Sequence, residues 1–218
     1  MQKEVLSGLN LDNGEPIYTQ EYIQSLRDTD KKHPDKLKII AQRGGQEDML
    51  SIDADIKICG GSRGGSKSFS SLMEVLKDIK NPDFHATILR NEKDDLQSLV
   101  TDSYKLFSQF GTYNKSQNDM TWNFDNGGWL KFSYYAGAYQ DFKTRFQGRQ
   151  YAYVCIDEGT QCPYKKFKYL LTNNRNAAHI RNRFWITCNP DPESWVRKFI
   201  DWWVTDEGYI DPERNGVI

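Results

Sequence analysis

Residues 60–68 form a glycine-rich loop that reads Gly60-Gly61-Ser62-Arg63-Gly64-Gly65-Ser66-Lys67-Ser68. Just before it, polar and apolar residues alternate from Asp55 to Cys59, which predicts a strand. Just after it, apolar residues recur at helical spacing from Lys67 to Ile79. Glycines let the backbone approach a ligand closely, and the free N–H groups of a helix N-terminus attract anions. The order strand, glycine loop, helix therefore predicts a phosphate-binding loop.

The loop also carries the side chains that such a site needs. Lys67 is placed to contact the β- and γ-phosphates of a nucleotide, and the Ser68 hydroxyl is placed to bind Mg²⁺. Ser66 stands where the motif usually has its last glycine, and counting from Gly60 instead leaves one residue inserted. A serine there narrows the backbone geometry and predicts slower turnover. The alternative interpretation is a glycine-rich turn before an ordinary helix. The candidate nucleotide-binding residues of the loop are Gly61, Ser62, Gly64, Gly65, Ser66, Lys67 and Ser68.

A pair of acids follows the most apolar strand of the sequence. Residues 151–156 read Tyr-Ala-Tyr-Val-Cys-Ile and lead into Asp157-Glu158. Asp157 is placed to hold Mg²⁺, directly or through water, and Glu158 to polarise an attacking water as general base. A strand that ends in two solvated acids is the alternative, and it is favoured when this segment is taken alone. The phosphate loop upstream reverses that preference.

A second strand end is polar. The strand Arg183–Thr187 leads into Cys188-Asn189-Pro190. Thr187 or Asn189 is a candidate to sense the γ-phosphate, whereas an ordinary Asn-Pro turn explains the same residues equally well.

The remaining segments predict an α/β fold. Further strands and helices alternate along the chain, and Asp125-Asn126-Gly127-Gly128 is typical of the turn of a β-hairpin. We therefore expect a mainly parallel central sheet flanked by helices, with a β-hairpin insertion. Residues 1–40 are expected to form a lead segment or small appendage, and 41–218 the main domain. The other predicted elements are the strands 86–89, 120–124 and 129–132 and the helices 94–110 and 193–204.

Bulk composition narrows the function classes. The net charge is −1, so any contact with nucleic acid requires a local basic patch. None of the four cysteines forms a CxxC pair and the three histidines are far apart, which argues against a zinc site and favours a reducing compartment. The sequence has neither a signal peptide nor an apolar run of about 18 residues, so no membrane association is expected.

Taken together, the motifs over residues 40–218 resemble the large terminase subunit of tailed phages and prophages. Gln46, within Gly45–Leu50, resembles the family's adenine-recognising glutamine motif. The loop with its internal Arg63 resembles Walker A, and Gln147-Gly148-Arg149 with Asp157-Glu158 resembles the approach to Walker B. Residues 187–190 resemble the coupling motif, in which Thr187 and Asn189 would link loss of the γ-phosphate to movement.

The resemblance implies a P-loop NTPase of the ASCE type. Such a domain hydrolyses ATP with Mg²⁺ and drives double-stranded DNA, without regard to sequence, through a portal protein into a procapsid. It implies a ring of subunits on the portal, a monomer in isolation, a small terminase subunit as partner, and a location in the host cytoplasm, transiently at the portal vertex. The family's nuclease domain does not fit in this chain, so we expect a truncated piece or a separately encoded motor, without nuclease activity.

Phosphoryl transfer usually requires an arginine on the developing charge, in cis or from a neighbouring subunit. Arg63 is the first candidate, and Arg90, Arg145 and Arg149 are alternative arginine fingers. A solvated surface arginine is the other interpretation for each.

Two basic segments, 165–169 and 175–183, are candidates for contacts with DNA phosphates, although a solvated helix face is favoured for either one alone. Two other functions stay open. A helicase-like motor would normally need a second motor domain, and a hydrolysis-deficient nucleotide-binding or scaffold domain is suggested by Ser66.

Overall fold

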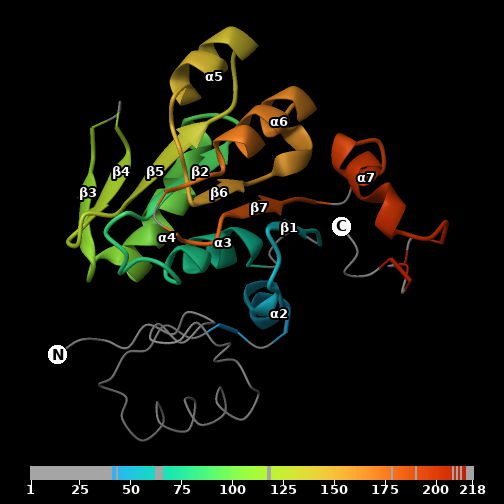
Figure 1. The fold of residues 1–218 in the computed structure, drawn as a ribbon, viewed down its shortest axis with the longest axis horizontal. Helices are drawn as coiled ribbons and strands as arrows, with labels where there is room; N and C mark the ends of the chain where they lie inside the picture. Colours follow the sequence, from blue (N-terminus) through green and yellow to red (C-terminus); the bar gives the residue numbers. More distant parts are fainter. Residues whose placement is uncertain are drawn as a thin grey trace, which may run out of the picture.

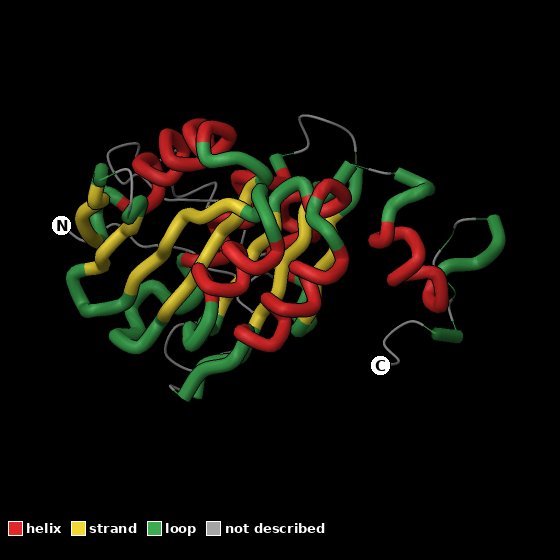
Figure 2. The backbone as a smooth tube through the Cα atoms, turned by 90° about the horizontal axis from the view of Figure 1, so that it is seen from above, coloured by secondary structure: helices red, strands yellow, loops and turns green. Residues whose placement is uncertain are grey.

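The structure is a computed structural model that describes residues 41–42, 44–61, 66–116, 119–177, 179–189, 191–207, 209, 211 and 213–214. The expected lead segment and the loop residues Ser62, Arg63, Gly64 and Gly65 lie outside the described residues. The rest forms one seven-stranded sheet in the order β1-β7-β6-β2-β5-β4-β3, with helices on both faces (Figures 1 and 2). The predicted α/β class is confirmed.

The first five strands of that order run parallel: β1 (Ile56–Cys59), β7 (Arg183–Thr187), β6 (Tyr153–Ile156), β2 (His85–Arg90) and β5 (Trp129–Tyr134). The register pairs Cys59 with Thr187, Ile156 with Ile186, and Leu89 with Ile156. The residues that follow these strands therefore meet at one edge of the sheet. This edge holds the end of β1, where the glycine-rich loop begins, and the acidic pair.

The predicted hairpin is confirmed and extends the sheet. β4 (Thr121–Phe124) runs antiparallel to β5, and β3 (Gly111–Asn114) adds an antiparallel edge strand that the sequence analysis did not predict. Gly127 in the turn has φ 107°, a conformation that favours glycine.

Two apolar layers enclose the sheet. One face is covered by α2 (Gly45–Ser51), α3 (Lys67–Val75) and α4 (Gln97–Phe107), and the other by α5 (Tyr139–Phe146) and α6 (Tyr164–Asn173) (Figure 1). β6 is buried along its whole length because both faces are covered. Its side chains alternate, with Tyr153 and Cys155 in the first layer and Val154 and Ile156 in the second.

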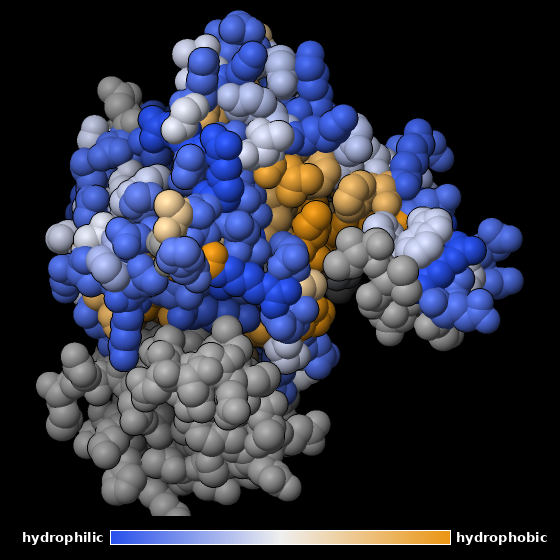
Figure 3. Space-filling model, viewed as in Figure 1, coloured by the Kyte–Doolittle hydropathy of each residue, from blue (hydrophilic) through white to orange (hydrophobic). Residues whose placement is uncertain are grey.

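The last described helix, α7 (Trp195–Ile200), lies at the β1 end of the sheet (Figures 1 and 2). Ser194 caps it by accepting a hydrogen bond from the Arg197 amide at 3.4 Å. Trp195 stacks on Phe167 of α6 and donates its indole N–H to the Cys162 carbonyl at 2.6 Å. Figure 3 shows apolar side chains gathered on the surface between α6 and α7. These contacts hold α7 to the helix that follows the acidic pair.

Three short 3₁₀ turns complete the described elements: η1 (Asp94–Leu96), η2 (Gly159–Gln161) and η3 (Asp201–Trp203). The helices predicted over 94–110 and 193–204 are thus each divided between a 3₁₀ turn and an α-helix. The four cysteine thiols are free and buried. Among the described helices, none combines the length and the hydropathy required to cross a bilayer.

Candidate nucleotide site

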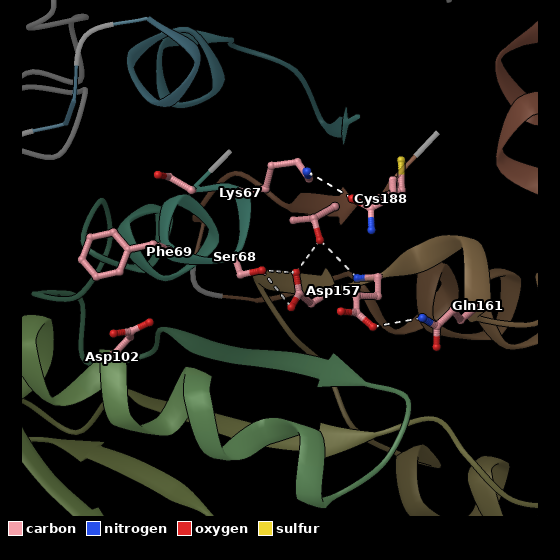
Figure 4. Close-up of a pocket in the computed structure, with 11 residues that line it drawn as sticks. Lys67, Ser68, Phe69, Asp102, Asp157, Gln161 and Cys188 are labelled. Carbon is pink, nitrogen blue, oxygen red and sulfur yellow. Dashed lines mark hydrogen bonds between the residues drawn. The ribbon is translucent and has the colours of Figure 1, made fainter. Parts of the chain in front are cut away.

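The start of α3 and the ends of β7 and β6 border a polar cleft of about 430 Å³ (Figure 4). That volume falls within the usual range of small-molecule sites. The N-terminus of α3 contributes one wall, and the residues after β6 and β7 contribute the other. The described residues that line the cleft are Ser66, Lys67, Ser68, Phe69, Asp102, Asp157, Glu158, Gln161, Thr187, Cys188 and Asn189.

Asp157 lies at the centre of this arrangement and is fully buried. The Ser68 hydroxyl donates to its two carboxylate oxygens at 2.8 and 3.0 Å. The Thr187 hydroxyl donates to Oδ1, and the Arg90 Nε donates to Oδ2 at 2.6 Å. A buried carboxylate is stable only when hydrogen bonds and a countercharge compensate it, and these three partners provide both.

The two predicted magnesium ligands, Ser68 and Asp157, are therefore in direct contact. A serine hydroxyl and a carboxylate are hard oxygen donors of the kind that Mg²⁺ prefers. The donor chemistry of this pair fits the metal that the sequence motifs imply.

Lys67 is the first residue of α3, so its side chain starts from the positive end of the helix dipole. Its Nζ donates to the Gly61 carbonyl at 3.0 Å and to the Asn189 Oδ1 at 3.4 Å. The lysine thus links the start of the glycine loop to the end of β7, across the cleft.

Glu158 follows Asp157 in a left-handed backbone conformation, with φ 59° and ψ 45°. Its backbone N–H donates to the Thr187 hydroxyl at 3.1 Å, and its Oε2 accepts from the side-chain Nε2 of Gln161 at 3.0 Å. A Cβ on Gly159 would lie 2.3 Å from the Ile186 side chain, so only glycine lets this turn pack on β7. Gln161 was not among the predicted site residues. The sequence feature that could have indicated its contact with Glu158 is its position three residues later in the chain.

Ser66 takes the backbone conformation that the missing glycine would supply, with φ 57° and ψ 12°. We expect Ser66→Gly to raise the free energy of unfolding by about 0.5–1 kcal/mol, because the left-handed strain that it removes exceeds the extra entropy of glycine in the unfolded chain. Urea denaturation measures this difference. Ser66→Ala keeps the strained Cβ and is the matched control, for which no gain is expected. A Ser66→Gly protein no more stable than the parent would contradict the strain argument.

Of the other predicted site residues that the structure describes, some contact the site and others lie away from the cleft. Arg90 is in the site through its ion pair with Asp157. Arg145 donates to the Tyr134 carbonyl at 2.7 Å and stacks on that ring, and Arg149 is exposed and donates to the Arg145 carbonyl. Gln46 is buried on α2, where its side-chain oxygen accepts from the Gln42 amide, and it is not among the described residues that line the cleft.

The basic segments are only partly available to a polyanion. Lys166 is buried and donates to the Tyr135 and Gly137 carbonyls, and Arg183 is buried against Glu74. Neither phosphate contacts nor the favoured solvated face holds for these two residues, because the fold turns both cations inward. For the exposed residues, among them Lys165, Lys168 and Arg175, both interpretations stay open.

Solved structures with the same fold include phage packaging proteins. The large terminase of a thermophilic bacteriophage is 19% identical with a TM-score of 0.55, over 69% of this chain and 39% of that chain. The same terminase also matches in complex with ADP and with ATP-gamma-S. The large terminase ATPase domain of Thermus phage P74-26 is 12% identical with a TM-score of 0.55, over 79% of this chain and 78% of that chain.

The large terminase of bacteriophage HK97 is 12% identical with a TM-score of 0.55, over 76% of this chain and 37% of that chain. The chain thus spans about two fifths of the HK97 terminase and of the terminase from the thermophilic bacteriophage. No curated protein matches the sequence. A family model described as "Terminase large subunit, T4likevirus-type, N-terminal" matches residues 58–216, well over half of the chain. The chain therefore belongs to the family of terminase large subunit N-terminal domains.

Proposed function

We propose that this domain hydrolyses ATP with Mg²⁺ and uses the energy to move double-stranded DNA into a phage procapsid. The observation that carries the proposal is the contact between Ser68, at the start of α3, and Asp157, at the end of β6. Two segments 89 residues apart in the sequence thereby bring a phosphate-binding helix terminus to an acidic pair. Membership in the terminase family supports DNA packaging as the purpose of the hydrolysis.

The site residues that the sequence motifs predict each have a task in this proposal. Lys67 and the N-terminus of α3 bind the phosphates, Ser68 and Asp157 hold Mg²⁺, and Glu158 accepts a proton from the attacking water. Mg²⁺ bound there would neutralise charge on the phosphate oxygens. Thr187 and Asn189 report the state of the phosphates, because one contacts Asp157 and the other contacts Lys67.

The partners follow from the family and stay part of the proposal. They are the portal protein, a small terminase subunit, double-stranded DNA and further copies of this chain in a ring, in the host cytoplasm and at the portal vertex. The described arginines leave the finger unassigned: Arg145 and Arg149 contact their own chain, and Arg63 lies outside the described residues.

The test is Mg²⁺-dependent ATP hydrolysis measured against protein concentration. We expect a rate that rises faster than linearly and that disappears when EDTA removes the metal, because a ring brings one subunit's arginine to the next subunit's site. A rate strictly proportional to protein would indicate an arginine in cis. ATP binding without hydrolysis, even with DNA at high protein concentration, would contradict the proposal and favour the hydrolysis-deficient alternative.

One observation weakens that alternative. The hydrolysis-deficient alternative was suggested by Ser66, which occupies the position of a glycine. Ser66 nevertheless adopts the left-handed conformation, and α3 begins directly after it. Its carbonyl accepts from the Ser70 amide at 2.8 Å, as the first turn of the helix requires. The serine thus leaves the phosphate-binding helix terminus intact.

A further inference from the structure

Arg90 is a charged residue that contacts the proposed metal ligand Asp157 but has no task in the proposed reaction. It ends β2, and the register that pairs Leu89 with Ile156 brings it level with Asp157. Its Nε lies 2.6 Å from Asp157 Oδ2, its side chain is 16% exposed, and the carboxylate is fully buried. Burial strengthens this ion pair relative to one in water.

Arg90 is also fixed from a second side. Its Nη1 donates to the Asp95 carbonyl at 2.8 Å and to the Ser98 hydroxyl at 3.0 Å, and these two residues lie in η1 and α4. The guanidinium is thus held between the start of α4 and the end of β6. An arginine finger must instead point its free donors at the transferred phosphate.

We propose that Arg90 is a positioning residue that competes with the divalent cation for Asp157. Metal binding is thereby linked to the contacts that Arg90 makes at the start of α4. This inference rests on the proposed function, because the cation is the one that the nucleotide brings. Two positive charges cannot share one buried carboxylate without repulsion, so the cation must weaken the pair between Arg90 and Asp157. By reciprocity, contacts that hold Arg90 on Asp157 lower the affinity for the cation.

The test is the affinity for Mn²⁺, titrated into the ADP-bound chain and followed by the electron paramagnetic resonance of free Mn²⁺. Arg90→Gln removes the competing charge while keeping a side chain that can donate to Asp157. We expect it to bind Mn²⁺ on the order of tenfold more tightly than the parent. Arg90→Lys keeps the charge and is the matched control, expected to stay within about threefold of the parent.

Unchanged or weaker Mn²⁺ binding by folded Arg90→Gln would overturn the proposal, and a fall in kcat without a change in Mn²⁺ affinity would do the same by making Arg90 catalytic. If Arg90→Gln does not fold, Ser98→Ala decides, because it alters only an exposed hydroxyl that holds Nη1. We expect Ser98→Ala to tighten Mn²⁺ binding about two- to threefold, and no change would overturn the inference. A parent chain that binds neither ADP nor Mn²⁺ would instead overturn the proposed function, and this inference with it.

Discussion

Glu158→Gln is expected to slow ATP hydrolysis by about 10²–10⁴-fold, the usual contribution of a positioned general base. The carboxylate lies in the cleft, one residue after the buried Asp157, and accepts a hydrogen bond from Gln161. Glutamine keeps the shape of the side chain but cannot accept the proton of the attacking water. Steady-state phosphate release at saturating ATP measures the loss.

The same substitution should leave ATP affinity within about twofold, because the base acts in the transition state rather than in the bound ground state. Glu193→Gln, on an exposed residue outside the cleft, is the matched control and should hydrolyse ATP at the parent rate. A Glu158→Gln protein that retained about a tenth or more of the parent rate would exclude Glu158 as the base. Loss of ATP binding would assign it to nucleotide binding.

Glu74→Gln is expected to lower the free energy of unfolding by about 3–5 kcal/mol, the usual cost of breaking a buried ion pair. Glu74 is on α3 and fully buried. Its carboxylate lies 3.3 Å from Lys57 Nζ and 2.9 Å from Lys77 Nζ. The Arg183 Nε lies 2.9 Å away in an ion pair whose geometry is not that of a hydrogen bond. Without the Glu74 carboxylate, the one carboxylate left in an ion pair with these three buried cations, among the described residues, would be Asp78, which contacts Arg183.

Urea denaturation measures this loss, and Lys105→Gln is its control. Lys105 pairs with Asp102 at 2.6 Å, but both side chains are exposed, so the control should cost less than about 1 kcal/mol. A Glu74→Gln protein destabilised no more than Lys105→Gln would show that the cluster contributes nothing net to folding.

The cost of Glu74→Gln should depend on pH through Lys57. Burial lowers the pKa of Lys57 from 10.5 to about 8, and Glu74 opposes that shift. Between pH 8 and 10.5 the unfolded chain therefore holds more protons than the folded one, and stability rises with pH. Removing Glu74 lowers the pKa of Lys57 further, so the variant begins to gain stability at a lower pH. The difference between variant and parent should thus shrink as the pH rises toward 8.

The sequence predicted the parts of the site that lie next to strand ends. The loop after β1, the acids after β6 and the polar residues after β7 each follow a strand that the sequence pattern predicts, and parallel strands bring their carboxyl ends to one edge. The contact of Ser68 with Asp157 follows from that rule once the strands are neighbours. Strand order and register had to come from the structure.

Contacts between distant side chains were beyond sequence reasoning. Arg90 reaches Asp157 because β2 and β6 are neighbours in a register that no local pattern encodes. Lys166 lies between two exposed lysines and has the same residue type as they do, yet it is buried with two backbone carbonyls as its acceptors. A rule that assigns charged residues to the surface must miss both.

Two of the elements that the sequence analysis did not predict, α5 and β3, have few apolar residues at regular spacing. α5 buries only Phe142 and Phe146, one turn apart, and the rest of the helix is polar. β3 is four residues long and, as an edge strand, buries none of them fully. Apolar periodicity finds elements that bury a full face, and neither of these does.

All five residues of β7 are buried, which limits how this strand can change over evolution. Its first residue, Arg183, contacts Glu74, and its last, Thr187, contacts Asp157 and Glu158. The three between pack in both apolar layers, and Ile186 also fills the space beside Gly159. A substitution at any of these five positions alters a contact, so we expect it to need a compensating substitution in the residues that β7 contacts. Relatives that have diverged widely should therefore carry paired changes linking this strand to α3 and to the turn after β6.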